Sequence, residues 1–99
     1  MNKNYQRGTR FERIIIQTVE KLGYSTLRTA GSHGFADVVA VNRNLVRFIQ
    51  SKVTKDKKIR ISTYKLDIAK ILETSIPENV TKELWIKRDR EKVYKILIL

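Results

Sequence analysis

A predicted β-hairpin with polar residues inside its strands constrains this sequence most. Residues 35–41, FADVVAV, and 45–53, LVRFIQSKV, are both rich in the β-branched and aromatic residues typical of strands. The segment 42–44, NRN, has the composition of a short turn, so the two runs predict an antiparallel hairpin. Asp37 and Gln50 are about equally far from that turn. The hairpin therefore brings these two polar side chains together within an otherwise apolar sheet.

Lys52 adds a third polar group to the same hairpin. Alternate residues of a strand point to one side, so Phe48, Gln50 and Lys52 share a face. A solvated strand face is one interpretation of this pattern. The other is a site, because a carboxylate and an amide oxygen can hold a hard divalent cation and an ammonium can neutralise phosphoryl charge. The second interpretation predicts metal-dependent phosphodiester hydrolysis.

The rest of the chain predicts further helices and strands. Apolar residues recur at helical spacing over residues 8–22, where Thr9 has the position of an N-cap, Glu12 completes a capping box, and Gly23 is a natural stop. Residues 1–6 are polar, and we expect them to fray. Strands are expected at 24–29, 80–87 and 93–99, loops at 30–34, 55–60 and 88–91, and a second helix at 62–74. The order α-β-β-β-α-β-β predicts an α/β fold with a central mixed five-stranded sheet flanked by helices.

The size and composition of the chain narrow the kinds of site that it can build. Its 99 residues predict a single domain, 1–99. The absence of cysteine excludes disulfides and thiolate metal sites, and one histidine, His33, cannot build a zinc site alone. Any metal must therefore be held mainly by oxygen, which favours Mg²⁺ or Mn²⁺. No apolar run is long enough to span a membrane and no signal-peptide pattern is present, so we expect an intracellular protein with no membrane partner.

The charge balance indicates a polyanionic partner. Twenty-one Lys and Arg residues face ten Asp and Glu residues, which gives a net charge of +11. Such an excess in a short chain is typical of proteins that bind nucleic acid. A generally basic protein without a nucleic-acid partner is the alternative.

The polar residues also carry a family resemblance. Asp37, followed in the next strand by Gln50-Ser51-Lys52, is similar to the PD-(D/E)xK nuclease motif, and the chain more narrowly resembles the archaeal Holliday-junction resolvases, including those encoded by archaeal viruses. The matching segments are GTRFER at 8–13, RTAGS at 28–32, ADVVA at 36–40 and the Gln-x-Lys of 50–52. The resemblance implies a restriction-endonuclease-like fold. It also implies a Mg²⁺-dependent endonuclease, with Mn²⁺ as the alternative ion, that acts as a homodimer and cuts four-way branched double-stranded DNA in paired symmetric positions.

The resemblance implies a role for individual residues. The catalytic residues would be Glu12, Ser32, Asp37, Gln50 and Lys52, and the metal-site residues would be Glu12, Asp37, Gln50 and Ser51. The residues expected to contact DNA are Arg10, Arg13, Arg28, Lys55, Lys57, Lys58 and Arg60.

Two departures from the family pattern bear on activity. Ala36 stands in place of the motif proline, and Gln50 stands in place of the strand acid. The second change removes one negative charge, so we expect weaker metal binding and the loss of the nearest anionic partner of Lys52. Two other functions stay open. One is a different PD-(D/E)xK DNA nuclease, and the other is a basic DNA-binding protein that keeps the fold with weakened catalysis. The expected compartment is the cytoplasm, or the host cytoplasm if a virus encodes the chain.

Overall fold

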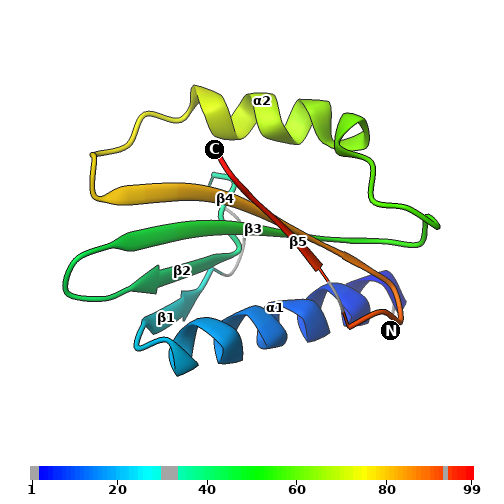
Figure 1. The fold of residues 1–99 in the computed structure, drawn as a ribbon, viewed down its shortest axis with the longest axis horizontal. Coiled ribbons are helices and arrows are strands. Elements are labelled where there is room, and N and C mark those ends of the chain that lie inside the picture. Colours follow the sequence, from blue (N-terminus) through cyan, green and yellow to red (C-terminus); the bar gives the residue numbers. More distant parts are fainter. Residues whose placement is uncertain (1–2, 30–33, 93) are drawn as a thin grey trace.

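A mixed sheet forms the centre of the fold in a computed structural model that describes residues 3–29, 34–92 and 94–99. Five strands lie side by side in chain order (Figure 1). They are β1 (Ser25–Arg28), β2 (Val38–Val41), β3 (Val46–Thr54), β4 (Val80–Arg88) and β5 (Tyr94–Ile98). β3 and β4 pair in parallel, whereas the other neighbours pair antiparallel. β1 and β5 are therefore the two edges of the sheet.

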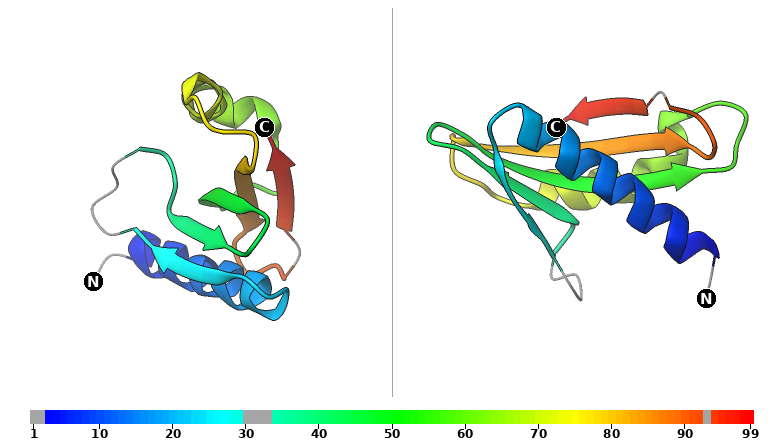
Figure 2. Two further views of the ribbon diagram at one scale, coloured as in Figure 1. Left: turned by 90° about the vertical axis from the view of Figure 1, so that its left-hand side faces the viewer. Right: turned by 90° about the horizontal axis from the view of Figure 1, so that it is seen from below.

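Helices cover both faces of this sheet (Figures 1 and 2). The long helix α1 (Lys3–Lys21) packs on one face against β1, β2 and β3. A 3₁₀ turn, η1 (Ile61–Tyr64), and α2 (Lys65–Glu73) lie on the other. Parallel strands need a crossover connection, and η1 with α2 forms the one between β3 and β4. The predicted α-β-β-β-α-β-β order and the mixed five-stranded sheet are confirmed. Among the described residues, no helix has the length and apolar character needed to cross a bilayer.

The start of α1 differs from the prediction. The helix already includes Lys3, so Thr9 lies inside it and is not an N-cap, and the expectation of a frayed end is wrong for residues 3–6. The apolar periodicity begins only at Phe11, and for this reason the earlier turns were not predicted. Residues 1 and 2 lie outside the described part of the chain.

The end of α1 follows the prediction. Gly23 has a φ of +94°, which glycine adopts without a steric penalty. The Gly23 N–H donates to the Glu20 carbonyl at 3.0 Å, and the Tyr24 N–H donates to the Val19 carbonyl at 3.1 Å. These two bonds form a Schellman motif, which ends the helix and turns the chain into β1.

Two apolar cores lie on opposite faces of the sheet. The core under α1 consists of Phe11, Ile15, Val19, Val38, Ala40, Ile49 and Trp85, and the core under α2 consists of Phe35, Ala36, Tyr64, Ile71, Leu84 and Ile86. Each fully buried large apolar side chain contributes about 1.5–3 kcal/mol. On β3, Ile49 joins the core under α1 while Phe48 packs against the core under α2. Gln50 and Lys52, at alternate positions from Phe48, therefore face α2.

Candidate active site

The β2–β3 hairpin brings Asp37 beside the Ile49–Ser51 segment of β3. The last regular pair of the ladder is Val38 with Ile49. The Asp37 N–H donates to the same Ile49 carbonyl at 2.8 Å, so the ladder bulges at Asp37, next to Gln50. At the turn, Asn42 Oδ1 accepts hydrogen bonds from the backbone N–H groups of Asn44 and Leu45, both at 2.8 Å. This local closure sets the register and with it the position of both polar residues.

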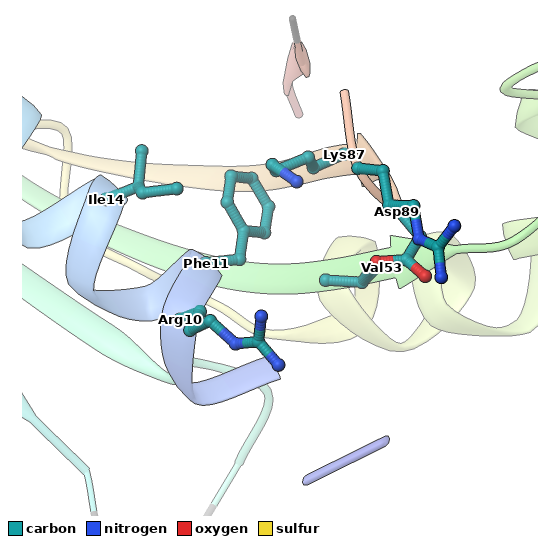
Figure 3. A pocket seen from close by; sticks show the side chains of 7 residues that line it. Arg10, Phe11, Ile14, Val53, Lys87 and Asp89 are labelled. Atoms are coloured by element: carbon teal, nitrogen blue, oxygen red, sulfur yellow. The ribbon is translucent and has the colours of Figure 1, made fainter. Parts of the chain in front are cut away.

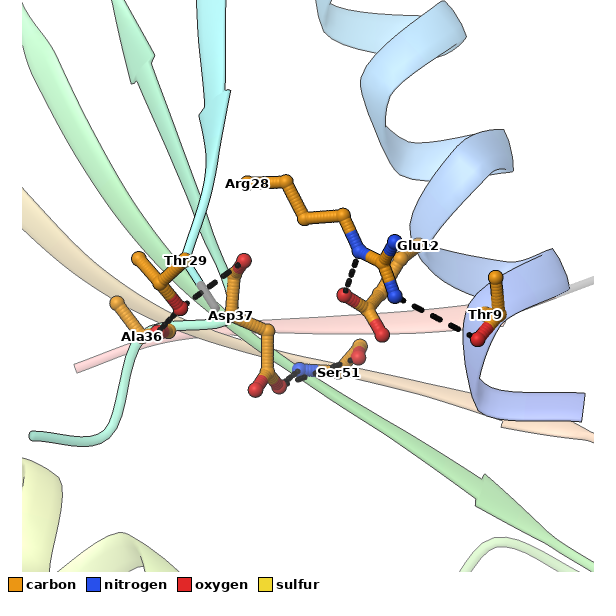
Figure 4. Close-up of polar contacts among 7 residues, drawn as sticks. All are labelled: Thr9, Glu12, Arg28, Thr29, Ala36, Asp37 and Ser51. Carbon is orange, nitrogen blue, oxygen red and sulfur yellow. Dashed lines mark hydrogen bonds and ion pairs between the residues drawn. The ribbon is translucent and has the colours of Figure 1, made fainter. Parts of the chain in front are cut away.

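The Asp37 carboxylate is held in one orientation by Ser51. Its Oδ2 accepts the Ser51 backbone N–H at 2.8 Å and the Ser51 hydroxyl at 3.2 Å (Figure 4). The backbone carbonyl of Asp37 accepts the Thr29 N–H at 3.0 Å, which ties the segment to the end of β1. The other carboxylate oxygen, Oδ1, takes no part in these bonds. Asp37 is thus an oriented carboxylate with one oxygen available to a further partner.

The side-chain oxygen of Gln50 lacks a partner. Gln50 Oε1 is buried, and among the described residues nothing donates a hydrogen bond to it. An unsatisfied buried carbonyl oxygen costs about 1–3 kcal/mol, so such groups are rare in folded proteins and call for an explanation. A cation or a water molecule bound beside Asp37 would satisfy it. Gln50 is therefore placed to act as an oxygen ligand.

Glu12 reaches the same region from α1. Arg28 Nε at the end of β1 donates to Glu12 Oε1 at 3.0 Å, and Arg28 Nη2 lies 3.5 Å from Thr9 Oγ1. In Figure 4 the Glu12 carboxylate points away from α1 toward the strand ends that carry Asp37 and Ser51. The structure therefore brings Glu12 and Arg28 to the neighbourhood of Asp37 as an ion pair.

Lys52 has an anionic partner that the sequence did not predict. Its Nζ lies 3.4 Å from Oδ1 of Asp67, in the first turn of α2. About a third of each side chain is exposed, at 36% for Lys52 and 31% for Asp67. The acid that the family pattern places at position 50 is absent, as expected, and α2 supplies Lys52 with a different anion, Asp67.

The donor set fits a hydrated divalent cation. Within the described residues, no group of three or more His, Cys, Asp or Glu residues could hold a metal ion. The available ligands near the hairpin are therefore few, and all are oxygens: Oδ1 of Asp37, for which the described residues provide no hydrogen bond, the amide oxygen of Gln50 and the carboxylate of Glu12. Mg²⁺ and Mn²⁺ prefer oxygen, and Mg²⁺ keeps several waters when it binds through one or two carboxylates. The residues present match that requirement.

Comparison with known proteins identifies the family. The profile of the archaeal Holliday junction resolvase (Hjc) family matches residues 3–97. The chain belongs to this family. It is 33% identical over 75 residues to the crossover junction endodeoxyribonuclease Hjc of Methanocaldococcus jannaschii, across 76% of this chain and 54% of that protein. The chain thus spans about half the length of this curated relative.

A solved structure supports the fold of this Hjc-family chain. Archaeoglobus fulgidus Hjc, a Holliday junction resolvase from an archaeal hyperthermophile, superposes with a TM-score of 0.69 at 22% sequence identity. The match covers 92% of this chain and 76% of the other. The sheet with helices on both faces is therefore the architecture of the solved relative.

Basic residues of this Hjc-family chain gather near the N-terminal half of α1 and the end of β3. A hollow of about 160 Å³ separates α1 from the β4–β5 turn (Figure 3). It is lined by Arg10, Phe11, Ile14, Val53, Lys87, Asp89 and Arg90. Arg88 Nε, at the end of β4, donates to the Asp56 carbonyl at 2.9 Å and so joins this end of β4 to the loop after β3.

The residues predicted to bind DNA lie mostly on the surface. Arg10 and Arg13 are exposed on α1, and the four basic residues of the loop after β3 are exposed as well; these are Lys55, Lys57, Lys58 and Arg60. Arg28 is 46% exposed in its pair with Glu12. Sequence reasoning missed Lys87 and Arg90, although the charged segment 88–91 was expected to be a turn. Ser32 and His33 lie outside the described residues.

A second buried polar cluster, on the α1 face, was also missed. Glu83 is fully buried on β4 and accepts two hydrogen bonds from Arg47 at 2.8 Å, one from Trp85 Nε1 at 2.9 Å and one from Thr81 Oγ1 at 2.5 Å. The Arg47 guanidinium also lies 5.3 Å from the ring centre of Tyr24. Both carboxylate oxygens are satisfied by protein groups, so this cluster offers nothing to a ligand.

The ionisation of this second cluster follows from its contacts. Burial alone would raise the pKa of Glu83, but the hydrogen bonds from Arg47, Thr81 and Trp85 outweigh burial and hold the pKa below its ordinary value of 4.5. The hydrogen bond to Glu83 raises the pKa of Arg47. Both groups therefore stay charged near neutral pH. A single Glu within the alternating strand TKELWI was the signal that could have revealed the cluster.

Proposed function

We propose that this chain is a divalent-metal-dependent endonuclease that resolves four-way DNA junctions by paired symmetric cuts. The observation that carries the proposal is the buried side-chain oxygen of Gln50, which has no hydrogen-bond partner among the described residues, next to the oriented carboxylate of Asp37. Membership of the archaeal Holliday junction resolvase family supports it, as do the names of the matched proteins, a crossover junction endodeoxyribonuclease and a Holliday junction resolvase.

The proposed metal ligands are Asp37, Gln50 and Glu12. A bound Mg²⁺, or Mn²⁺ as the alternative, supplies an acidified water and positive charge for the phosphoryl oxygens. Ser51 acts on Asp37 rather than on the ion, since both its N–H and its hydroxyl donate to Asp37 Oδ2. This assignment gives Ser51 an orienting role in the metal site.

The cationic side chains at the site act on the phosphate. Lys52 projects from the same face of β3 as Gln50, so its ammonium can neutralise the charge that builds up when water attacks phosphorus and the P–O bond breaks. Arg28, which pairs with Glu12 at 3.0 Å, and Arg13, which follows Glu12 on α1, would bring guanidinium charge to the phosphate. These side chains supply positive charge where the substrate is most negative.

The basic surface beside the site would follow the DNA backbone. With a net charge of +11, the chain can neutralise several phosphates at once. A protein that contacts about six phosphates shows a slope near −5 in a plot of log affinity against log salt concentration. The hollow lined by Arg10 adds two further cations, Lys87 and Arg90, to the predicted contacts. We therefore expect steep salt dependence for junction binding.

Two symmetric cuts require two copies of the site, and we propose a homodimer. β5 is an edge strand, and Ile96 and Ile98 on it are 41% and 69% exposed. An exposed edge with apolar side chains favours contact with another chain. Sedimentation equilibrium of the wild type and of Ile98→Lys tests this surface. A dimer that becomes monomeric in the variant supports the proposal, and a monomeric wild type contradicts it.

A substrate panel tests the activity itself. Labelled four-way junction, matched duplex and flap DNA are incubated with the protein in Mg²⁺, Mn²⁺ or EDTA, with Asp37→Asn in parallel. Paired symmetric cuts confined to the junction, absent in EDTA and in the variant, support junction resolution. Cutting of all three substrates would indicate a general nuclease. Binding without cutting at any metal concentration would indicate a DNA-binding protein with weakened catalysis.

A further inference from the structure

The contact between α2 and Lys52 suggests how this chain compensates for its missing strand acid. Gln50 is neutral where an acid would lie two residues from Lys52 on the same face of β3. Instead, Asp67 Oδ1 on α2, the helix that covers this face of β3, lies 3.4 Å from Lys52 Nζ. We propose that Asp67 is a positioning residue that holds the Lys52 ammonium for catalysis in place of a strand acid. This inference rests on the proposed nuclease function.

The position of Asp67 on α2 favours a directed contact. Residues three and four apart share a helix face, and Asp67 lies three residues after Tyr64 and four before Ile71. Tyr64 is 7% exposed and Ile71 is fully buried against the sheet. Asp67 therefore lies on the helix face that packs on the sheet, although it is charged. Its proximity to Lys52 accounts for an acid at this place.

The exposure of the pair indicates a role in orientation more than in stability. Both side chains are about one-third exposed, and ion pairs of that exposure contribute little to folding. Lys52 has a flexible four-carbon stem, so an anchoring carboxylate restricts the positions of its ammonium. Misplacement of a catalytic group by about 1 Å can cost about 10²-fold in rate. The main consequence of losing Asp67 is therefore expected in the chemical step.

A set of three variants tests the proposal. Asp67→Asn removes the charge and keeps the shape, Glu73→Gln is the matched control at the exposed end of the same helix, and Gln50→Glu/Asp67→Asn restores an acid on β3. Each is assayed for single-turnover cleavage of a saturating four-way junction with Mg²⁺, for junction Kd and for Tm. Independently of activity, brief acetylation with acetic anhydride in EDTA, read by mass spectrometry, reports the reactivity of the Lys52 amine.

The expected result separates positioning from folding. Asp67→Asn lowers the cleavage rate between about 10- and 10²-fold with Kd and Tm unchanged, and Lys52 is acetylated faster. Glu73→Gln matches the wild type in every measurement. The double variant regains most of the cleavage rate and slows acetylation of Lys52 again, because the acid at position 50 takes over as its partner.

Several results would overturn the proposal. An unchanged or higher cleavage rate in Asp67→Asn would do so, as would a double variant no faster than Asp67→Asn alone. If the wild type cleaves no junction at all, the proposed nuclease function fails. The acetylation measurement then still tests whether Asp67 holds the Lys52 ammonium. Unchanged Lys52 reactivity in Asp67→Asn overturns the positioning role, and increased reactivity upholds Asp67 as the group that holds Lys52.

Discussion

Two polar clusters in this molecule differ in how completely the protein satisfies them. Glu83 is fully buried and receives four hydrogen bonds, two of them from Arg47. At the β2–β3 hairpin, Gln50 Oε1 has no partner among the described residues, and Asp37 uses one oxygen for Ser51. Buried polar groups with a purely structural role are normally satisfied. The incomplete cluster is therefore the better candidate for a ligand site.

Breaking the complete cluster should have the largest effect on stability. Arg47→Met leaves the Glu83 carboxylate buried without its cation, and the loss of one partner of a buried ion pair costs about 3–5 kcal/mol. Urea unfolding followed by circular dichroism measures the free energy of unfolding. Arg43→Met, in the exposed turn before β3, is the control and should change it by less than about 0.5 kcal/mol. A loss below about 1 kcal/mol in Arg47→Met would show that the Arg47–Glu83 pair contributes little to the free energy of unfolding.

Changing the incomplete cluster should affect activity instead. Asp37→Asn keeps an acceptor for Ser51 but removes the charge, so cleavage of a four-way junction should fall by about 10²- to 10³-fold while Tm stays nearly constant. Glu78→Gln, an exposed acid in the loop before β4, controls for the change in net charge and should cleave at the wild-type rate. Equal losses in both variants would point to general electrostatics.

Acid pH should weaken the complete cluster in a predictable direction. The hydrogen bonds to Glu83 hold its folded-state pKa below 4.5, so the unfolded chain binds the proton more readily. The stability from this group is present above pH 4.5 and is lost as the pH falls through the lower, folded-state pKa. Urea unfolding between pH 7 and pH 3 should show a smaller acid loss in Glu83→Gln than in the wild type. An equal loss of unfolding free energy on acidification in both proteins would contradict a lowered pKa for Glu83.

Restoring an acid to the incomplete cluster should have the smallest effect. Gln50→Glu adds a carboxylate beside Asp37, which should raise Mn²⁺ affinity by about tenfold and cleavage at low metal by a similar factor. Calorimetric titration with Mn²⁺ measures the affinity, and Gln17→Glu on an exposed position of α1 is the matched control. No change in either quantity would place Gln50 outside the site.

The hairpin explains why part of the candidate site was predictable. The turn at Asn42 and the strand patterns on either side of it bring Asp37 next to Gln50, and both are local features of the sequence. The order of the elements along the chain and the mixed character of the sheet were also predictable from the succession of helical and strand patterns.

The contacts that sequence reasoning missed are non-local. Asp67 reaches Lys52 only because the crossover lays α2 on that face of β3, and a lone acid in the first turn of a helix otherwise suggests only a favourable interaction with the helix dipole. Glu83 meets Arg47 through the parallel pairing of β3 with β4, whose register depends on the length of the crossover. The early turns of α1 were missed because the apolar periodicity begins only at Phe11 and the capping-box pattern at Thr9 indicated a later start.

Manganese binding, followed by the electron paramagnetic resonance signal of the free ion, tests the central claim most directly. The wild type should bind Mn²⁺ at its hairpin site, Asp37→Asn should lose that binding, and Glu83→Gln, if folded at the temperature used, should keep it. Retention of full Mn²⁺ affinity in Asp37→Asn would contradict the claim that the incomplete polar cluster holds the catalytic metal.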